Sequence, residues 1–193
     1  MPDTTTELLT LEQFAELPDT EERLELVRGR VRVMSPVHGP AATVASNIVG
    51  LLTLHVLPRK LGRIFSDNTG FALLGAEHTN RSPDVAFIRA DRLPPRGIGP
   101  GPIRIAPDLV VEVLSPTERA VILEEKLADY RRAGTPLIWV ANPPHRLVTV
   151  HPADGPSYTL REGDTLTGGH VLPEFHCAVS ELFEGLAPPD DEG

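Results

Sequence analysis

The sequence predicts an α/β fold in which a central β-sheet is flanked by helices. Two observations carry this prediction. The segment 109–114 is apolar on both faces except at Glu112, as expected for a central strand buried on both sides. Directly after it, Ser115-Pro116-Thr117-Glu118 has the form of a helix start with a capping box, and a second apolar strand follows at 137–140. A helix between two such strands returns over the sheet.

The N-terminal half predicts two helices and five strands. The first helix opens with the capping box Thr10-Leu11-Glu12-Gln13 and ends near Pro18, and the second runs from about Gly39 to Val56, before Pro58. The predicted strands are 24–27 and 31–34, which form a hairpin around Arg28-Gly29-Arg30, then 63–66 and 71–74, which pair around Asn68-Thr69-Gly70, and finally 84–88.

The C-terminal half begins with a loop rich in proline and glycine at 91–106. It contains Gly97-x-Gly99-x-Gly101, but a phosphate-binding loop needs a strand before it and a helix after it. We therefore expect a mobile surface loop that could lie over the site. The later elements are a helix over 115–133 that stops at Gly134, strands at 147–151 and 158–161, and a short closing helix at 179–183.

Composition predicts one domain over 10–186, between a flexible tail at 1–9 and an acidic tail at 187–193. The 193 residues suffice for a real core. No apolar stretch approaches the length of a membrane span and no export signal is visible, so we expect a cytoplasmic protein without a membrane partner. The single Cys177 rules out an intrachain disulfide and fits a reducing compartment. A net charge of −9 argues against a broad, nonspecific nucleic-acid surface, although it permits a local basic groove.

Asp84, Glu112 and Lys126 are the candidate catalytic residues. A carboxylate inside an apolar strand is costly to bury, and a divalent cation is the simplest compensation for two converging carboxylates. Glu112 lies about 10 Å down its strand from Ser115, and Lys126 lies about 16 Å along the returning helix. The Lys126 amine should therefore reach the level of Glu112, with Tyr130 on the same helix face. Asp84 can join them if the two strands pair.

Each residue also has a plainer interpretation. Asp84 alone is more readily a strand-start aspartate after a proline, whereas Glu112 needs a partner and favours a functional role. Lys126 could equally be a solvated lysine beside Glu125 or Asp129. Tyr130 is more readily a residue at the core edge than a catalyst. The histidines and Cys177 lack zinc-ligand spacing, His38 is best interpreted as a loop residue, and no nucleophile elbow is present.

Several short motifs, taken in order, resemble one known family. They are Leu24-Glu25-Leu26-Val27-Arg28-Gly29, Met34-Ser35-Pro36, Gly70-Phe71, Arg81-Ser82-Pro83-Asp84-Val85-Ala86-Phe87, Pro107-Asp108-Leu109-Val110-Val111-Glu112-Val113-Leu114-Ser115-Pro116 and Lys126-x-x-x-Tyr130-x-x-x-Gly134. Over residues 10 to 185 the chain resembles the Uma family of proposed restriction endonucleases, within the PD-(D/E)XK nuclease superfamily. Each motif is weak alone, and the ordered set is specific.

The resemblance implies a restriction-endonuclease-like fold, in which a mixed central sheet is flanked by helices and preceded by an N-terminal helix and β-hairpin. It implies that Asp84, Glu112 and the Val113 carbonyl bind Mg²⁺ or Mn²⁺. Lys126 would be the superfamily lysine, moved to the helix from its usual strand position, here Leu114. Glu25 would support the metal, unless it takes the solvent-facing position of its hairpin strand, and Tyr130 would line the site. Homodimers are expected for this fold.

The chain departs from the family pattern at two places. Ile122 stands where an acidic residue is frequent, and Thr135-Pro136-Leu137-Ile138-Trp139 replaces the more usual Val-Pro-Glu-Tyr-Trp. Three functions therefore remain open. The first is a Mg²⁺-dependent endonuclease acting on DNA. The second is a catalytically weak or inactive nuclease fold that binds nucleic acid or protein. The third is a metal-dependent hydrolase of a smaller phosphoester.

Overall fold

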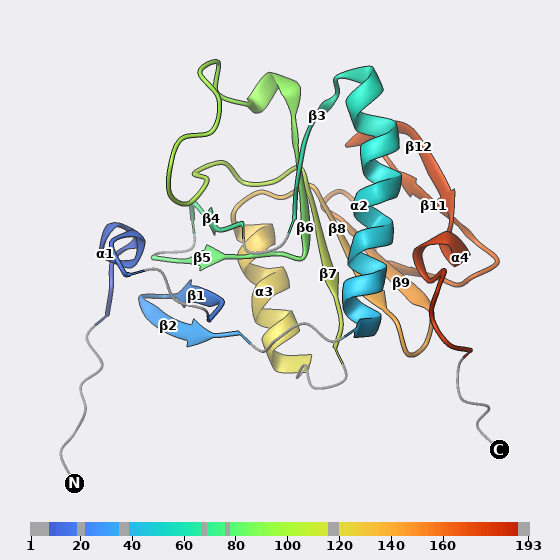
Figure 1. The fold of residues 1–193 in the computed structure, drawn as a ribbon, viewed down its shortest axis with the longest axis horizontal. Coiled ribbons are helices and arrows are strands. Elements are labelled where there is room, and N and C mark those ends of the chain that lie inside the picture. Colours follow the sequence, from blue (N-terminus) through green and yellow to red (C-terminus); the bar gives the residue numbers. More distant parts are fainter. Residues whose placement is uncertain are drawn as a thin grey trace, which may run out of the picture.

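A six-stranded sheet forms the centre of the protein (Figure 1). The computed structural model describes residues 8–18, 22–34, 39–66, 69–75, 78–115 and 120–188. The strand order is β10-β9-β8-β7-β6-β3, and β7 and β8 are parallel while all other neighbours are antiparallel. The strands are β3 (Gly62–Ser66), β6 (Val85–Arg89), β7 (Leu109–Val113), β8 (Leu137–Asn142), β9 (Leu147–Pro152) and β10 (Tyr158–Leu160). The mixed α/β fold is thus confirmed.

A smaller sheet with the order β2-β1-β5-β4 lies at one end of the central sheet. Its strands are β1 (Leu24–Val27), β2 (Arg30–Val33), β4 (Phe71–Ala72) and β5 (Asn80–Arg81). The predicted hairpin of β1 and β2 is confirmed, with Val27 opposite Arg30. Its two turn residues, Arg28 and Gly29, have φ of 48° and 77°. Positive φ at both residues is typical of a type I′ hairpin turn, whose twist matches the right-handed twist of the strands.

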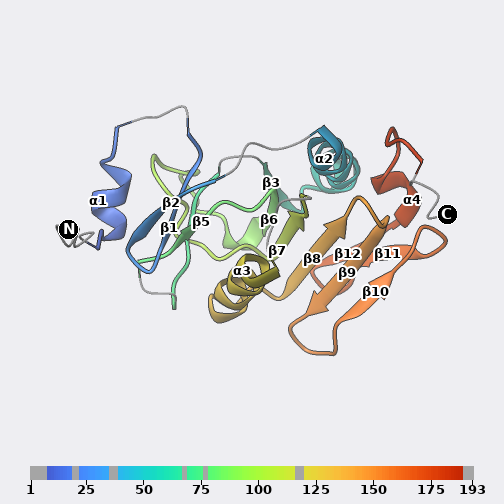
Figure 2. The ribbon, with the colours of Figure 1, turned by 90° about the horizontal axis from the view of Figure 1, so that it is seen from below.

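Helices cover both faces of the central sheet. The helix α2 (Gly39–Arg59) lies on one face and α3 (Ala120–Arg132) on the other, as Figure 2 shows. The helix α1 (Leu11–Ala15) lies beside the small sheet, and its predicted capping box between Thr10 and Gln13 is confirmed. A short 3-10 helix, η1, spans Ala90–Arg92, and α4 (Val179–Leu182) follows a hairpin of β11 (Thr165–Gly168) and β12 (Leu172–Ala178).

Side chains along β7 alternate between two cores. Leu109, Val111 and Val113 pack with α2 and with the β11–β12 hairpin. Val110 packs on the other side, in the cluster that contains Leu127 and Tyr130 of α3. Successive strand residues point to opposite faces, so Glu112 shares the α3 face with Val110. The sheet therefore directs Glu112 toward the helix that carries Lys126.

The helix α2 corrects one expectation from the sequence. By length and composition alone, Gly39–Arg59 could cross a membrane, and it is the one such helix among the described residues. A single helix of this kind is weak evidence, because the core helix of a soluble protein passes the same test. Here Val44, Ile48, Leu52 and Val56 recur at four-residue steps and are buried against the central sheet.

Strand pairing differs from prediction in the first half of the chain. Segments 63–66 and 71–74 were expected to pair with each other, but β3 pairs with β6 in the central sheet and β4 pairs with β5 in the small one. The strand β6 pairs with β3 over five residues, with Phe87 and Ala86 opposite Ile64 and Phe65, whereas β4 has two residues. The strand β5 and the β11–β12 hairpin were not predicted.

Several predictions fall on positions outside the described residues. These are Pro116-Thr117-Glu118 of the α3 start, Asn68 of the predicted turn, His38, and most of both predicted tails (1–7 and 189–193).

Candidate active site

Asp84 and Glu112 come together because the strands that carry them pair. The strand β6 runs antiparallel to β7 with Val85 opposite Val111. Continuing that register by one position places Asp84, just before β6, beside Glu112 of β7. The Asp84 carboxylate accepts a hydrogen bond of 2.7 Å from the Val113 backbone N–H through Oδ2. The condition for Asp84 to join Glu112, that their two strands pair, is met, and the Asp84 side chain is bound to the residue that follows Glu112.

Glu112 is a carboxylate that is only 1% exposed, on a central strand. Its Oε2 accepts a 2.6 Å hydrogen bond from the Lys126 ammonium, and its Oε1 accepts one of 2.6 Å from the Tyr130 hydroxyl. Burial raises the pKa of Glu112 above its ordinary value of 4.5, and the neighbouring Asp84 charge adds to the rise, while the Lys126 charge opposes it. The same burial, with the Glu112 charge, raises the pKa of Tyr130 well above its ordinary value.

Lys126 lies inside the protein, so the alternative of a solvated helix lysine is wrong. Its side chain is 5% exposed, and its ammonium forms an ion pair with Glu112. The acidic neighbours that might have paired with it have other partners: Glu125 accepts from Arg32 at 2.7 Å, and Asp129 accepts from Arg81. Because Lys126 and Tyr130 are four residues apart on α3, they face β7 together.

Glu25 belongs to a second buried cluster, next to the first. Arg81 donates to Glu25 at 2.7 Å and to Asp129 at 2.7 Å, and all three side chains are fully buried. Burial works to lower the pKa of Arg81, but the Glu25 and Asp129 carboxylates outweigh it and raise that pKa above its ordinary value. Glu25 also accepts a 2.9 Å hydrogen bond from the Ser82 backbone N–H. The alternative that Glu25 faces solvent is wrong, because the cluster of Glu25, Arg81 and Asp129 buries it.

This second cluster anchors the segment that leads to Asp84. Arg81 and Ser82 are both tied to Glu25 of β1, and Arg81 is also tied to α3 through Asp129. Asp84 follows two residues later. Sequence reasoning did not single out Arg81 or Asp129 as partners. The available signal was the charged Arg81 in the motif Arg81-Ser82-Pro83-Asp84, whose charge needs compensation if the motif is buried.

The donor set suits a hard divalent cation. Among the described residues there is no group of three or more His, Cys, Asp or Glu side chains placed to hold a metal. The candidate ligands are instead two carboxylates, Asp84 and Glu112, against the one positive charge of Lys126. Oxygen ligands of this kind are those that Mg²⁺ and Mn²⁺ take, commonly with water or substrate oxygens completing the shell. The Val113 carbonyl as a third ligand stays a prediction.

Comparisons with known proteins identify the family and the fold. Residues 11–180 match the family model described as "Uma2: Putative restriction endonuclease". A crystal structure titled as a "putative nuclease belonging to DUF820" from Anabaena variabilis superposes with a TM-score of 0.79 at 22% sequence identity, over 91% of this chain and 97% of that one. At that identity the likeness shows the shared fold. No curated protein matches the chain. Because the family model spans most of the sequence, this protein belongs to the Uma2 family.

Proposed function

We propose that this protein is a metal-dependent endonuclease that hydrolyses phosphodiester bonds in DNA. One observation carries the proposal: residues far apart in the chain, Asp84, Glu112 and Lys126, are joined around one point by the Asp84–Val113 and Lys126–Glu112 hydrogen bonds. Two carboxylates and a lysine in a single site suit phosphoryl chemistry that depends on charge stabilisation. Family membership supports the class of reaction.

Asp84 and Glu112, with the Val113 carbonyl, would hold Mg²⁺ or Mn²⁺. When bound, the ion would polarise a phosphodiester oxygen and lower the pKa of a water. The Val113 N–H orients Asp84, and Tyr130 orients Glu112. The Lys126 ammonium already compensates the Glu112 charge, and it can donate to an attacking water or to the phosphate oxygens as negative charge develops.

Three partly exposed arginines could contact a polyanionic substrate despite the net charge of −9. Arg28, Arg32 and Arg132 lie on the β1–β2 hairpin and α3, where they also form ion pairs with Asp129 and Glu125. Arginine side chains in this position can contact phosphates on either side of the cut bond. A homodimer, in which two such sites cut both strands, and a cytoplasmic location complete the proposal.

The test combines cleavage with metal binding. Purified protein is incubated with supercoiled plasmid, linear duplex, single-stranded DNA and RNA, with Mg²⁺ or Mn²⁺. Glu112→Gln and Asp84→Asn should abolish cleavage, and calorimetry should show that both lose Mn²⁺ binding. Glu124→Gln, which changes an exposed glutamate on the same helix, is the matched control and should retain both activities. Cleavage that survives in Glu112→Gln would come from a contaminant and would refute the proposal.

Burial of the site favours a second candidate, a nuclease fold that binds nucleic acid or protein without turnover. Glu112 and Lys126 are almost completely buried, and both oxygens of Glu112 already have donors. This candidate predicts nucleic-acid or protein binding that neither Mn²⁺ nor Glu112→Gln alters. Loss of Mn²⁺ binding in Asp84→Asn would count against it.

A further inference from the structure

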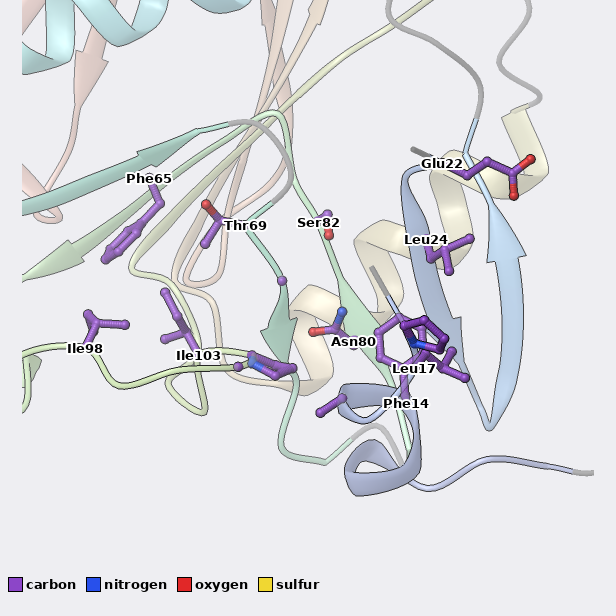
Figure 3. Close-up of a pocket in the computed structure, with 15 residues that line it drawn as sticks. Phe14, Leu17, Glu22, Leu24, Phe65, Thr69, Asn80, Ser82, Ile98 and Ile103 are labelled. Carbon is purple, nitrogen blue, oxygen red and sulfur yellow. The ribbon is translucent and has the colours of Figure 1, made fainter. Parts of the chain in front are cut away.

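A pocket of about 470 Å³ lies next to the candidate active site (Figure 3). Helix α1, strand β5 and the 98–103 part of the proline- and glycine-rich loop form its walls. Figure 3 shows the Asn80 side chain between Phe14 of α1 and Leu17, just after that helix, on one side and Ile103 on the other. A volume of this size lies within the roughly 300–1,000 Å³ range typical of small-molecule sites.

Asn80 supplies a polar group without a protein partner. The residue is only 3% exposed, and its Oδ1 has no hydrogen-bond partner in the described part of the chain. A buried acceptor left unpaired costs about 1–3 kcal/mol, so a donor from a molecule in the pocket would stabilise it. Gly70 makes room for this amide, because a Cβ at Gly70 would lie 2.8 Å from both Asn80 Oδ1 and Nδ2. The Asn80 carboxamide is therefore packed closely against Gly70 at the wall of the pocket.

The other walls of the pocket present polar and apolar groups in similar measure and include two aromatic rings. Phe14 comes from α1 and Phe65 from β3, and Ile98 and Ile103 come from the loop. The Phe65 ring is itself held edge-on by Phe71, with ring centroids 5.8 Å apart. Aromatic rings together with one fixed amide are the groups that recognise a planar heterocycle, by stacking and by hydrogen bonding to its edge.

Charge excludes a phosphate as the occupant. Among the described residues that line the pocket, none is lysine or arginine, and one, Glu22, is acidic. A phosphate would need compensating cations or several aligned N–H donors. A neutral nucleobase needs neither.

The pocket is close to the candidate metal ligand Asp84, because a residue that lines the pocket lies near Asp84 in the chain. Ser82 lines the pocket, and Asp84 is two residues further on. Two residues of fully extended chain span at most about 7 Å. A nucleotide whose base enters the pocket would therefore have its phosphate close to Asp84.

We propose that this pocket receives one unstacked nucleobase of the DNA strand, next to the phosphodiester bond that Asp84, Glu112 and Lys126 cut. The inference rests on the proposed function for the identity of the strand. Asn80 accepts a hydrogen bond from the edge of the base, and Phe14, which lies beside Asn80 in Figure 3, covers its face. The base pocket is therefore a source of sequence preference separate from the catalytic residues.

The first experiment pairs protein variants with abasic substrates. Oligodeoxynucleotides are prepared with each of the four bases, or an abasic site, on either side of the cut bond. For the preferred base, Asn80→Ala should lower kcat/KM about tenfold, the lower range of base discrimination by one side chain. On the abasic substrate, wild type and Asn80→Ala should cut equally. An equal loss on every substrate would mean that Asn80 is structural and would overturn the proposal.

Two further variants guard against a folding artefact. Phe14→Ala changes a partly buried residue of the short helix α1, so it tests the pocket without touching the central sheet. It should also reduce cleavage of the base-containing substrate and not of the abasic one. Asn47→Ala is the matched control, because Asn47 donates to the Leu182 and Glu184 carbonyls far from the pocket. It should change stability and leave base preference unchanged.

A binding measurement separates this proposal from the proposed function. The ¹⁵N-labelled Glu112→Gln protein is titrated with single-stranded homopolymers of each base in EDTA, and the Asn80 side-chain amide signals are followed. Shifts with at least one base, but not with an abasic strand, support the pocket even if wild type cuts nothing. If none of the four homopolymers shifts the Asn80 side-chain amide signals, the base pocket is refuted, whether or not the protein cleaves DNA.

Discussion

The Lys126 ammonium lies 2.6 Å from Glu112 Oε2, across 14 residues of sequence and from a helix to a strand. In the absence of a cation, the lysine is the positive charge nearest to a carboxylate that cannot reach solvent. A buried ion pair is costly to break by removing one partner, because the other charge is left uncompensated. The first prediction follows from this pair.

Lys126→Met should destabilise the fold by about 3–5 kcal/mol, because it leaves Glu112 buried without its counter-charge. A divalent cation can replace the missing charge, so Mn²⁺ should raise the unfolding midpoint of this variant more than that of wild type. Chemical denaturation with and without Mn²⁺ measures both effects. The other lysine of the chain, Lys60, is exposed, and Lys60→Met should have little effect. An equal response of both variants to Mn²⁺ would refute charge replacement at Glu112.

Tyr130→Phe removes one hydroxyl and nothing else. The loss should cost about 1.5–3 kcal/mol of stability, because the hydroxyl donates to a buried charged group. Denaturant unfolding gives the difference, and Tyr158→Phe is the control, since Tyr158 is the other tyrosine and is exposed. Similar stabilities of Tyr130→Phe and wild type would mean that water replaces the donor.

Arg81→Met should be among the most damaging substitutions outside the active site. It removes the cation shared by two buried carboxylates, Glu25 and Asp129, and we expect a loss of about 3–5 kcal/mol or failure to fold. Arg28 also approaches Asp129, at 3.7 Å, but its side chain is 53% exposed. Arg28→Ala should therefore cost no more than about 1 kcal/mol. Thermal unfolding of both variants measures the loss of stability. A similar loss in Arg81→Met and Arg28→Ala would contradict the prediction that only the buried arginine is essential to the cluster.

Cys177 should resist thiol reagents while the protein is folded. Burial raises the pKa of its thiol from 9.0 to about 12, and Glu181 adds to the rise. At pH 9.0 an unfolded thiol is half ionised, whereas the folded one is almost entirely neutral, and only the thiolate reacts quickly. Labelling at this pH should be slow in buffer and fast in denaturant. Fast labelling of the native protein would show that the strand β12 opens readily.

Much of the candidate active site could be predicted from the sequence, because its geometry within β7 and α3 depends on local rules. Strand rise, helix rise and the tilt of helical side chains placed Lys126 at the level of Glu112, and Tyr130 followed at helical spacing. The apolar character of Leu109–Val113 indicated a two-face-buried strand, and all five residues are buried. Each of these steps used residues within one strand–helix unit.

Long-range pairing was harder. Arg81 is separated from Glu25 and Asp129 by 56 and 48 residues, and it lies on a strand of two residues, too short for a periodic signal. The predicted pairing of 63–66 with 71–74 failed because a turn-like sequence between two apolar segments does not say which sheet each segment joins. The hairpin β11–β12 contains a register shift between Thr167 and Gly168, which breaks the alternation on which strand prediction depends.

The alternation along β7 has a consequence for how this protein can change. Odd-numbered residues of the strand pack in the α2 core, and the even-numbered Glu112 belongs to the candidate active site. Inserting or deleting one residue within the strand would exchange the two faces, placing a carboxylate in the apolar core and a valine in the candidate site. Length variation should therefore be excluded from these five positions and tolerated in the exposed turns at the edges of the fold, around an unchanged strand.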